Sequence, residues 1–368
     1  MNLSGSYIGR AGLDPISLAL SHLKSLTILN LDLDENEISH DNFRFFFENL
    51  SRLELLAIFH LRCQLTNEDL AELSSVLRTL KSLTILKLDL SSSKNLDDVG
   101  ITNFSHILKD LPLLESLNLD FSYCDKKIKE GIKNLFDALK YIKGLKRLKL
   151  DFSGLEKIGY EELKYISHAV GDLNPSLTHF ELLIGGTFMP RPIRLPSLFL
   201  SLKNLKYLTY LHLYLGEYAL KEKDVEILSS TLMELKMLTD LKLCLGSDNS
   251  EMKVESMKNF CLALKELSSL TKLSLIFYES FRISGEAIVE LCTAIRTLKN
   301  LTYLVLCFRE SNELRTVLER VVDILKDIKS LSMLNLSAGD HEDDAYKIYS
   351  LCKEVNLLPI LQAHRYYI

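Results

Sequence analysis

The sequence predicts an α/β fold in which short parallel strands alternate with helices as a solenoid of repeated units. The chain of 368 residues holds eleven runs of alternating apolar and polar residues, and equivalent positions in successive runs lie 27 to 32 residues apart. At the start of each run, the spacing between apolar residues changes from three positions to two, as expected where a turn leads into a strand. Between the runs, apolar residues at helical spacing predict one helix per repeat.

The eleven runs align on one apolar residue in each repeat, which we call the anchor. Apolar residues also lie three and six positions before the anchor and two and four positions after it, as around Leu86. Each run therefore predicts a strand that buries every second side chain. The anchors are Leu29, Leu56, Leu86, Leu117, Leu148, Phe180, Leu211, Leu241, Leu273, Leu304 and Leu334.

Helices are predicted between these strands from apolar stripes at positions i, i+3 and i+7. One stripe ends at Leu267 and the next at Leu298. The other faces of both segments are largely polar, so we expect each helix to bury one side only. The two stripes are Met257, Phe260, Leu264 and Leu267, and Ile288, Leu291, Ile295 and Leu298.

The repeated LxxLxxLxLxL pattern, which covers residues 15–355, resembles the leucine-rich repeats of the ribonuclease-inhibitor type. The resemblance implies a horseshoe of about 11 repeats of about 30 residues, with a parallel sheet on the concave face and helices on the convex face. The Asn or Cys that this family places five residues after the anchor is missing. Thr stands two residues before the anchor in seven repeats, so the chain is similar to a divergent, ciliate-like subtype.

The repeats continue in register, which predicts a single domain over residues 1–368. Residues 1–22 are expected to form an N-terminal cap with a short helix over 15–22, and residues 23–340 to form the repeats. Residues 341–368 are expected to form a C-terminal cap. In this cap DDAYKIYSLCKEV is predicted to be a helix, and LLPILQAHRYYI to supply a final strand.

One repeat departs from the pattern over residues 185–199. Pro190, Pro192 and Pro196 stand where a helix is expected. Proline lacks a backbone N–H and clashes within a helix, so we predict an extended or 3₁₀ connection there.

Composition limits the classes of partner. The net charge of −5 indicates no concentrated basic face of the kind that nucleic acid requires, and we expect neither a nucleic-acid nor a membrane partner. No stretch reaches the roughly 18 apolar residues needed to span a bilayer. The seven cysteines are scattered and form no CxxC pair, which favours reduced thiols and a cytoplasmic, reducing compartment.

Aspartate recurs three residues after the anchor at Asp32, Asp89, Asp120 and Asp151, on the predicted concave face. Like charges on adjacent strands repel by roughly 1 kcal/mol in water and ~3 kcal/mol at an effective dielectric constant of 20. Three explanations are open: neutralisation by Lys87, Arg147 and Lys149, recognition of a basic protein segment, or a bound divalent cation. The cation is disfavoured because three parallel strands do not supply the six to eight oxygens that calcium takes.

The C-terminal half places aromatic and aliphatic side chains on the same face. Such residues are typical of protein interfaces, so we predict a partner-binding patch for a protein ligand, such as a basic amphipathic helix. The alternative is that a strand, a loop or the curvature of the sheet covers them. The predicted contacts are Tyr210, His212, Tyr214, Ile276, Tyr303 and Val305, with Cys244, Cys307 and Met333 beside them.

Catalytic motifs are missing from the sequence: it holds no phosphate loop, GxSxG elbow or HExxH helix. We therefore expect no enzyme activity, no cofactor and no metal, and predict a protein-binding module or scaffold. One alternative is an enzyme regulator of the kind found among Ran GTPase-activating proteins, although no catalytic residue can be matched and their acidic tail is missing. The other alternative is a structural subunit of a large assembly.

Overall fold

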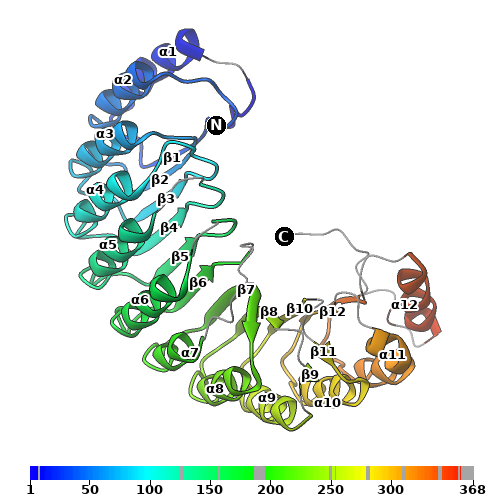
Figure 1. Ribbon diagram of the computed structural model, residues 1–368. Coiled ribbons are helices and arrows are strands. Elements are labelled where there is room, and N and C mark those ends of the chain that lie inside the picture. Colours follow the sequence, from blue (N-terminus) through cyan, green and yellow to red (C-terminus); the bar gives the residue numbers. More distant parts are fainter. Residues whose placement is uncertain are drawn as a thin grey trace. The chain divides into compact units, whose positions relative to one another are not determined.

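The computed structural model describes residues 1–6, 9–124, 128–155, 158–185, 195–247, 251–252, 254–278, 282–308, 312–338, 342–354 and 357. The chain divides into two compact units, Met1–Thr187 and Phe188–Ile368. In both units parallel strands alternate with helices along the chain (Figure 1), so the predicted α/β solenoid architecture is confirmed. No helix within the described ranges is long and apolar enough to cross a membrane.

The first unit contains six strands whose order in the sheet follows the chain. Each strand is five residues long and is preceded by a helix on one side of the sheet (Figure 1). The strands are β1 (Ile28–Asp32), β2 (Ile58–Arg62), β3 (Ile85–Asp89), β4 (Ser116–Asp120), β5 (Arg147–Asp151) and β6 (His179–Leu183). The helices are α1 (Gly9–Ser21), α2 (His40–Leu50), α3 (Asn67–Leu77), α4 (Asp98–Leu108), α5 (Lys129–Leu139) and α6 (Tyr160–Gly171).

The second unit has the same alternation, but four of its strands are longer than five residues, β7 and β8 most of all. The strand order is β7, β8, β10, β12, β13, and a separate small sheet pairs β9 with β11. The strands are β7 (Tyr210–Leu220), β8 (Asp240–Ser247), β9 (Glu251–Met252), β10 (Lys272–Phe277), β11 (Arg282–Ile283), β12 (Tyr303–Phe308) and β13 (Met333–Ser337). The helices are α7 (Pro196–Leu202), α8 (Glu222–Leu232), α9 (Val254–Glu266), α10 (Gly285–Ile295), α11 (Asn312–Leu325) and α12 (Glu342–Glu354).

Neighbouring strands pair so that anchors lie opposite anchors. Leu86, Leu117 and Leu148 are in register in the first unit, and the five anchors from Leu211 to Leu334 are in register in the second. The predicted anchor of the second repeat is wrong: Phe59, not Leu56, pairs with Leu29 and Leu86. The alignment slipped because Leu50 at the end of α2 supplies an additional apolar residue at the same three-residue spacing.

The core of each unit lies between its sheet and its helices. The anchor and the residues two and four positions after it are buried in every strand, and the predicted stripes of α9 and α10 are buried as well. The residues four positions after the anchor stack on their neighbours, and the Phe121 and Phe152 rings lie 5.9 Å apart. Phe277 and Phe308 repeat this stacking at 5.2 Å.

The N-terminal segment covers part of the edge of β1. Leu3 donates a backbone hydrogen bond to Asp32 at 2.9 Å, and Gly5 donates one to Asp34 at 3.0 Å. The helix predicted over residues 15–22 is longer and begins at Gly9.

The proline-containing connection differs from its prediction. A short helix, α7, begins at Pro196, where proline costs no hydrogen bond because N–H groups of the first turn have no partner within the helix. Pro190 and Pro192 lie outside the described residues. At the C-terminal end α12 confirms the predicted helix, whereas the strand expected in LLPILQAHRYYI lies outside the described residues except for Leu357.

The threonines two residues before the anchor form a hydrogen-bonded series across the repeats. The Thr271 hydroxyl donates to the Thr239 carbonyl at 2.9 Å, and the Thr302 hydroxyl donates to the Thr271 carbonyl at 3.1 Å. Each of these carbonyls also accepts two backbone N–H groups from the next strand. Where Thr occupies this position, its hydroxyl can link the strand entry to the preceding repeat, which is a more specific role than the β-strand preference of a branched side chain.

Replacing Thr271 with Val should lower the free energy of unfolding by about 0.5–1 kcal/mol, because the shape is kept while the hydrogen bond to Thr239 is lost. Thr271→Ser is the matched control, since Ser332 already makes the equivalent bond to Thr302. Urea denaturation followed by circular dichroism measures both. Equal stability of the Val and wild-type proteins would show that the hydroxyl contributes nothing.

Candidate functional site

The candidate site is the side of each unit's sheet opposite its helices, which we call the open face. Residues one before, one after and three after the anchor lie on it, and in β3 and β4 these positions are partly exposed while the positions between them are buried. Alternation along a strand sends successive side chains to opposite sides, so these three columns form the open face of the sheet. The predicted site residues all occupy these columns.

In the first unit, the column three residues after the anchor contains an arginine that the sequence alignment misplaced. Arg62 pairs in register with Asp32 on one side and with Asp89 on the other. With Phe59 as the anchor, the column is Asp32, Arg62, Asp89, Asp120, Asp151 and Leu183. The three predicted neighbours Asp89, Asp120 and Asp151 do lie on adjacent strands.

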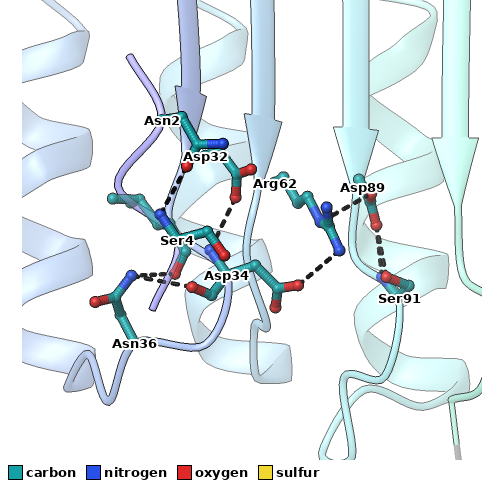
Figure 2. A network of polar contacts seen from close by, with 9 residues as sticks. Asn2, Ser4, Asp32, Asp34, Asn36, Arg62, Asp89 and Ser91 are labelled. Atoms are coloured by element: carbon teal, nitrogen blue, oxygen red, sulfur yellow. Dashed lines mark hydrogen bonds and ion pairs between the residues drawn. The ribbon is translucent and has the colours of Figure 1, made fainter. Parts of the chain in front are cut away.

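Arg62 neutralises one end of this column (Figure 2). Its Nη2 lies 2.8 Å from Asp34 Oδ2 and its Nε lies 3.3 Å from Asp89 Oδ2. Burial acts to lower the pKa of Arg62, but the carboxylates of Asp89 and Asp34 outweigh it and raise that pKa. Charge compensation therefore comes from within the column.

The aspartates themselves form the turns that end the strands. Asp120 Oδ1 accepts a hydrogen bond from the Ser122 backbone N–H at 2.9 Å, and Asp151 Oδ1 accepts one from Ser153 at the same distance. Asp32 and Asp89 do the same with the second residue after them (Figure 2). The next residue in each turn has a positive φ angle, as at Tyr123. These are Asx turns, in which aspartate caps its own backbone, and they explain why aspartate recurs.

Asp120 and Asp151 remain without a cationic partner in the described part of the chain. Within the described residues no ion pair joins either carboxylate to Lys87, Arg147 or Lys149, and the ion pair seen in this column is the one between Arg62 and Asp89. Burial raises the pKa of Asp120, and the neighbouring Asp151 carboxylate raises it further. Asp151 is itself only 8% exposed. Two adjacent carboxylates thus form an acidic end to the open face of the first unit.

The column one residue after the anchor is polar throughout the first unit: Asn30, His60, Lys87, Asn118, Lys149 and Glu181. Burial lowers the pKa of His60, and the Lys87 charge lowers it further. The open face of this unit is therefore hydrophilic and carries charges of both signs.

The predicted residues of β7 are more enclosed than the sequence indicated. His212 is only 6% exposed, and Tyr210 and Tyr214 are partly exposed. The Tyr278 hydroxyl lies 2.7 Å from that of Tyr214, and the two rings meet edge to face. The two tyrosines come from β7 and from the residue after β10, on either side of β8. Cys244 on β8, between these two strands, is buried, so one part of the predicted patch is covered.

Tyr278 was missed because the residue five positions after the anchor was compared only with the Asn or Cys of the family. Glycine at this position in the repeats of β7 and β8 is the feature of the sequence that indicates a close approach to the backbone. A Cβ atom on Gly216 would lie 2.7 Å from the Tyr278 ring, and one on Gly246 would lie 1.8 Å from the Gly216 carbonyl oxygen. Glycine is required here because the longer strands and the tyrosine ring approach the backbone closely.

Apolar side chains remain partly exposed on β10, β12 and β13. Ile276 lies next to Cys307, and Tyr303 lies next to Met333 in the sheet register. Val305 lies between Tyr303 and Cys307 on the same strand, and all of these residues are partly exposed. We call Ile276, Tyr303, Val305, Cys307 and Met333 the apolar patch.

Among the described residues no group of three or more His, Cys, Asp or Glu side chains is placed to hold a metal ion. A scan against protein-family models and a search of curated proteins both found no match for this chain.

Asp120→Asn should raise the free energy of unfolding at neutral pH by about 0.5–1 kcal/mol, because it removes a like-charge neighbour while its amide oxygen still caps Ser122. The folded-state pKa of Asp120 is raised, so its contribution to stability is fully present below the unfolded pKa and is lost as the pH rises through the folded pKa. The Asp120→Asn variant has no carboxyl group at this position, so it should not lose this stability as the pH rises. Chemical denaturation across acidic to neutral pH measures both effects.

Asp89→Asn is the matched comparison, because it breaks the ion pair with Arg62 while keeping the cap on Ser91. Asp89→Asn should leave the free energy of unfolding at neutral pH unchanged or lower it. Stabilisation by both variants to the same extent would contradict the distinction between the paired and unpaired carboxylates.

Proposed function

We propose that this protein is a non-catalytic binding module or scaffold that holds a protein partner on the open face of its sheet. The observation that carries the proposal is the apolar patch on β10, β12 and β13. Five partly exposed apolar side chains from three adjacent strands meet there. Contiguous exposed aromatic, aliphatic and methionine side chains are characteristic of protein-binding surfaces, whereas isolated ones are normal on any surface.

The first unit adds a polar surface that suits the same class of ligand. Asp120 presents a carboxylate beside that of the buried Asp151, and neither has a cationic partner among the described residues. A partner that places a Lys or Arg side chain against them removes the repulsion and gains a charge-assisted hydrogen bond. A basic or amphipathic protein segment is therefore the partner class that we assign to this unit.

The repeat type and the compartment belong to the same proposal. We assign the repeats to the ribonuclease-inhibitor-like class of leucine-rich repeats because each strand is followed by a helix at a spacing near thirty residues. None of the seven cysteines forms a disulfide in the described residues, and burial raises the pKa of Cys261 and of Cys292 to about 12, which keeps these thiols protonated and unreactive. Reduced thiols support a reducing, cytoplasmic location.

The proposal is tested by affinity capture with a variant that carries Tyr303→Asp and Val305→Asp. A charge on each of these open-face positions should abolish binding of a partner held by apolar contact, so the partner captured by the wild-type protein should be lost. Mass spectrometry of the captured proteins is the measurement, and circular dichroism establishes that the variant is folded.

Val99→Asp is the matched control, since Val99 is an exposed apolar residue on α4 and lies on the helical side of the sheet. It should retain the partner. Capture of the same proteins by the wild-type protein and the open-face variant would overturn the proposal.

A further inference from the structure

A second surface lies, in each unit, along the edge of the sheet where the strands begin, which we call the basic edge of that unit. Because the strands of each unit are parallel, the turns of that unit that lead from a helix into a strand lie along this edge. Basic residues recur in these turns five and eight positions before the anchor. They are Lys24, Arg78, Lys81, Lys109, Lys140 and Lys143 in the first unit, and Lys203, Lys206, Lys236, Lys265, Arg296, Lys299, Lys326 and Lys329 in the second.

Helix termini explain one of these two columns. Arg78, Lys109 and Lys140 are the C-terminal caps of α3, α4 and α5, where a positive charge interacts favourably with the helix dipole. The lysines five positions before the anchor lie beyond the helices, and all of them are exposed. Among them, Lys236 alone makes an ion pair within the described ranges, at 3.8 Å from Glu266. The fold leaves the charge of this column available.

Exposed apolar side chains lie in the same turns. Tyr141 is 64% exposed and stands between Lys140 and Lys143, with the Lys140 Nζ 5.5 Å from its ring centre. Leu113 occupies the corresponding turn before β4 and is also exposed. In the second unit Tyr207 and Met237 follow Lys206 and Lys236 and are exposed too. Cationic and apolar side chains therefore alternate along the basic edge.

We propose that the basic edge binds an acidic protein segment that also carries apolar side chains. Its carboxylates would pair with the exposed lysines, and its apolar residues would cover side chains such as Leu113 and Tyr141. The net charge of −5 conceals this surface because aspartates gather at the opposite ends of the strands, as at Asp120 and Asp151.

A peptide fits this edge better than nucleic acid or an anionic membrane does, because carboxylates lie between the cations. Asp110 is 3.3 Å from Arg78, and Glu115 is 2.8 Å from Lys146. A continuous array of phosphates would meet these carboxylates, whereas a peptide can place its acidic residues between them. None of the basic-edge residues lies on the open face, so this proposal and the proposed function can fail separately.

The test is fluorescence anisotropy with a synthetic peptide of repeated Glu-Glu-Leu units, titrated with the full chain. The variant carries Lys109→Glu and Lys143→Glu. The wild-type protein should bind the peptide, and the variant should bind about tenfold more weakly, because two favourable charge pairs become repulsive. A Tyr141→Ser variant, which changes no charge, should also weaken binding.

The matched control carries Lys94→Glu and Lys164→Glu, which reverse two exposed lysines away from the basic edge and should leave the affinity unchanged. Absence of binding by the wild-type protein, or an equal loss in the control, would overturn the proposal. Tighter binding of an oligothymidylate or of phosphatidylserine vesicles than of the peptide would overturn it as well, and would assign the edge to nucleic acid or to a membrane surface.

Discussion

In-register pairing of parallel strands is the constraint on which the rest of this structure depends. Equivalent residues of successive repeats lie about 4.8 Å apart, so a side chain in the middle of the sheet has the equivalent side chain of the next repeat on each side. Columns of apolar residues are stabilised by this arrangement because their side chains pack on one another, as the stacked Phe121 and Phe152 rings show. Threonine also benefits, because each hydroxyl can donate to the carbonyl of the preceding repeat. Charged columns are penalised, and Arg62 relieves that penalty at one end of the aspartate column alone.

The two units end their strands in different ways, and this determines the chemistry of each open face. In the first unit four of the six strands (β1, β3, β4 and β5) end at an Asp that caps an Asx turn and leaves a carboxylate at the strand end, whereas β2 ends at Arg62 and β6 at Leu183. In the second unit glycine replaces the capped residue in β7 and β8, these strands run on, and Tyr278 packs over Gly216. The first face is consequently polar and charged, whereas apolar residues remain partly exposed on the second.

The sequence predicted the repeat, the strand positions and the buried columns because these depend on periodicity, which many residues report together. It failed at the second repeat, where Leu50 allowed two alignments and concealed Arg62 from the aspartate column. It also missed the Asx turns, although Ser follows Asp by two residues in three of the runs. The Tyr214–Tyr278 contact spans residues 64 positions apart, which no local pattern reports.

The central claim is that the open face around Val305 contacts a protein partner. The most direct test places a photo-cross-linking amino acid at Val305 and, in a separate protein, at the exposed helical position Val99, and compares the cross-linked products formed in cells. A discrete cross-linked product from position 305 and none from position 99 is the predicted result. Cross-linking to the same proteins from both positions, or from neither, would contradict the account.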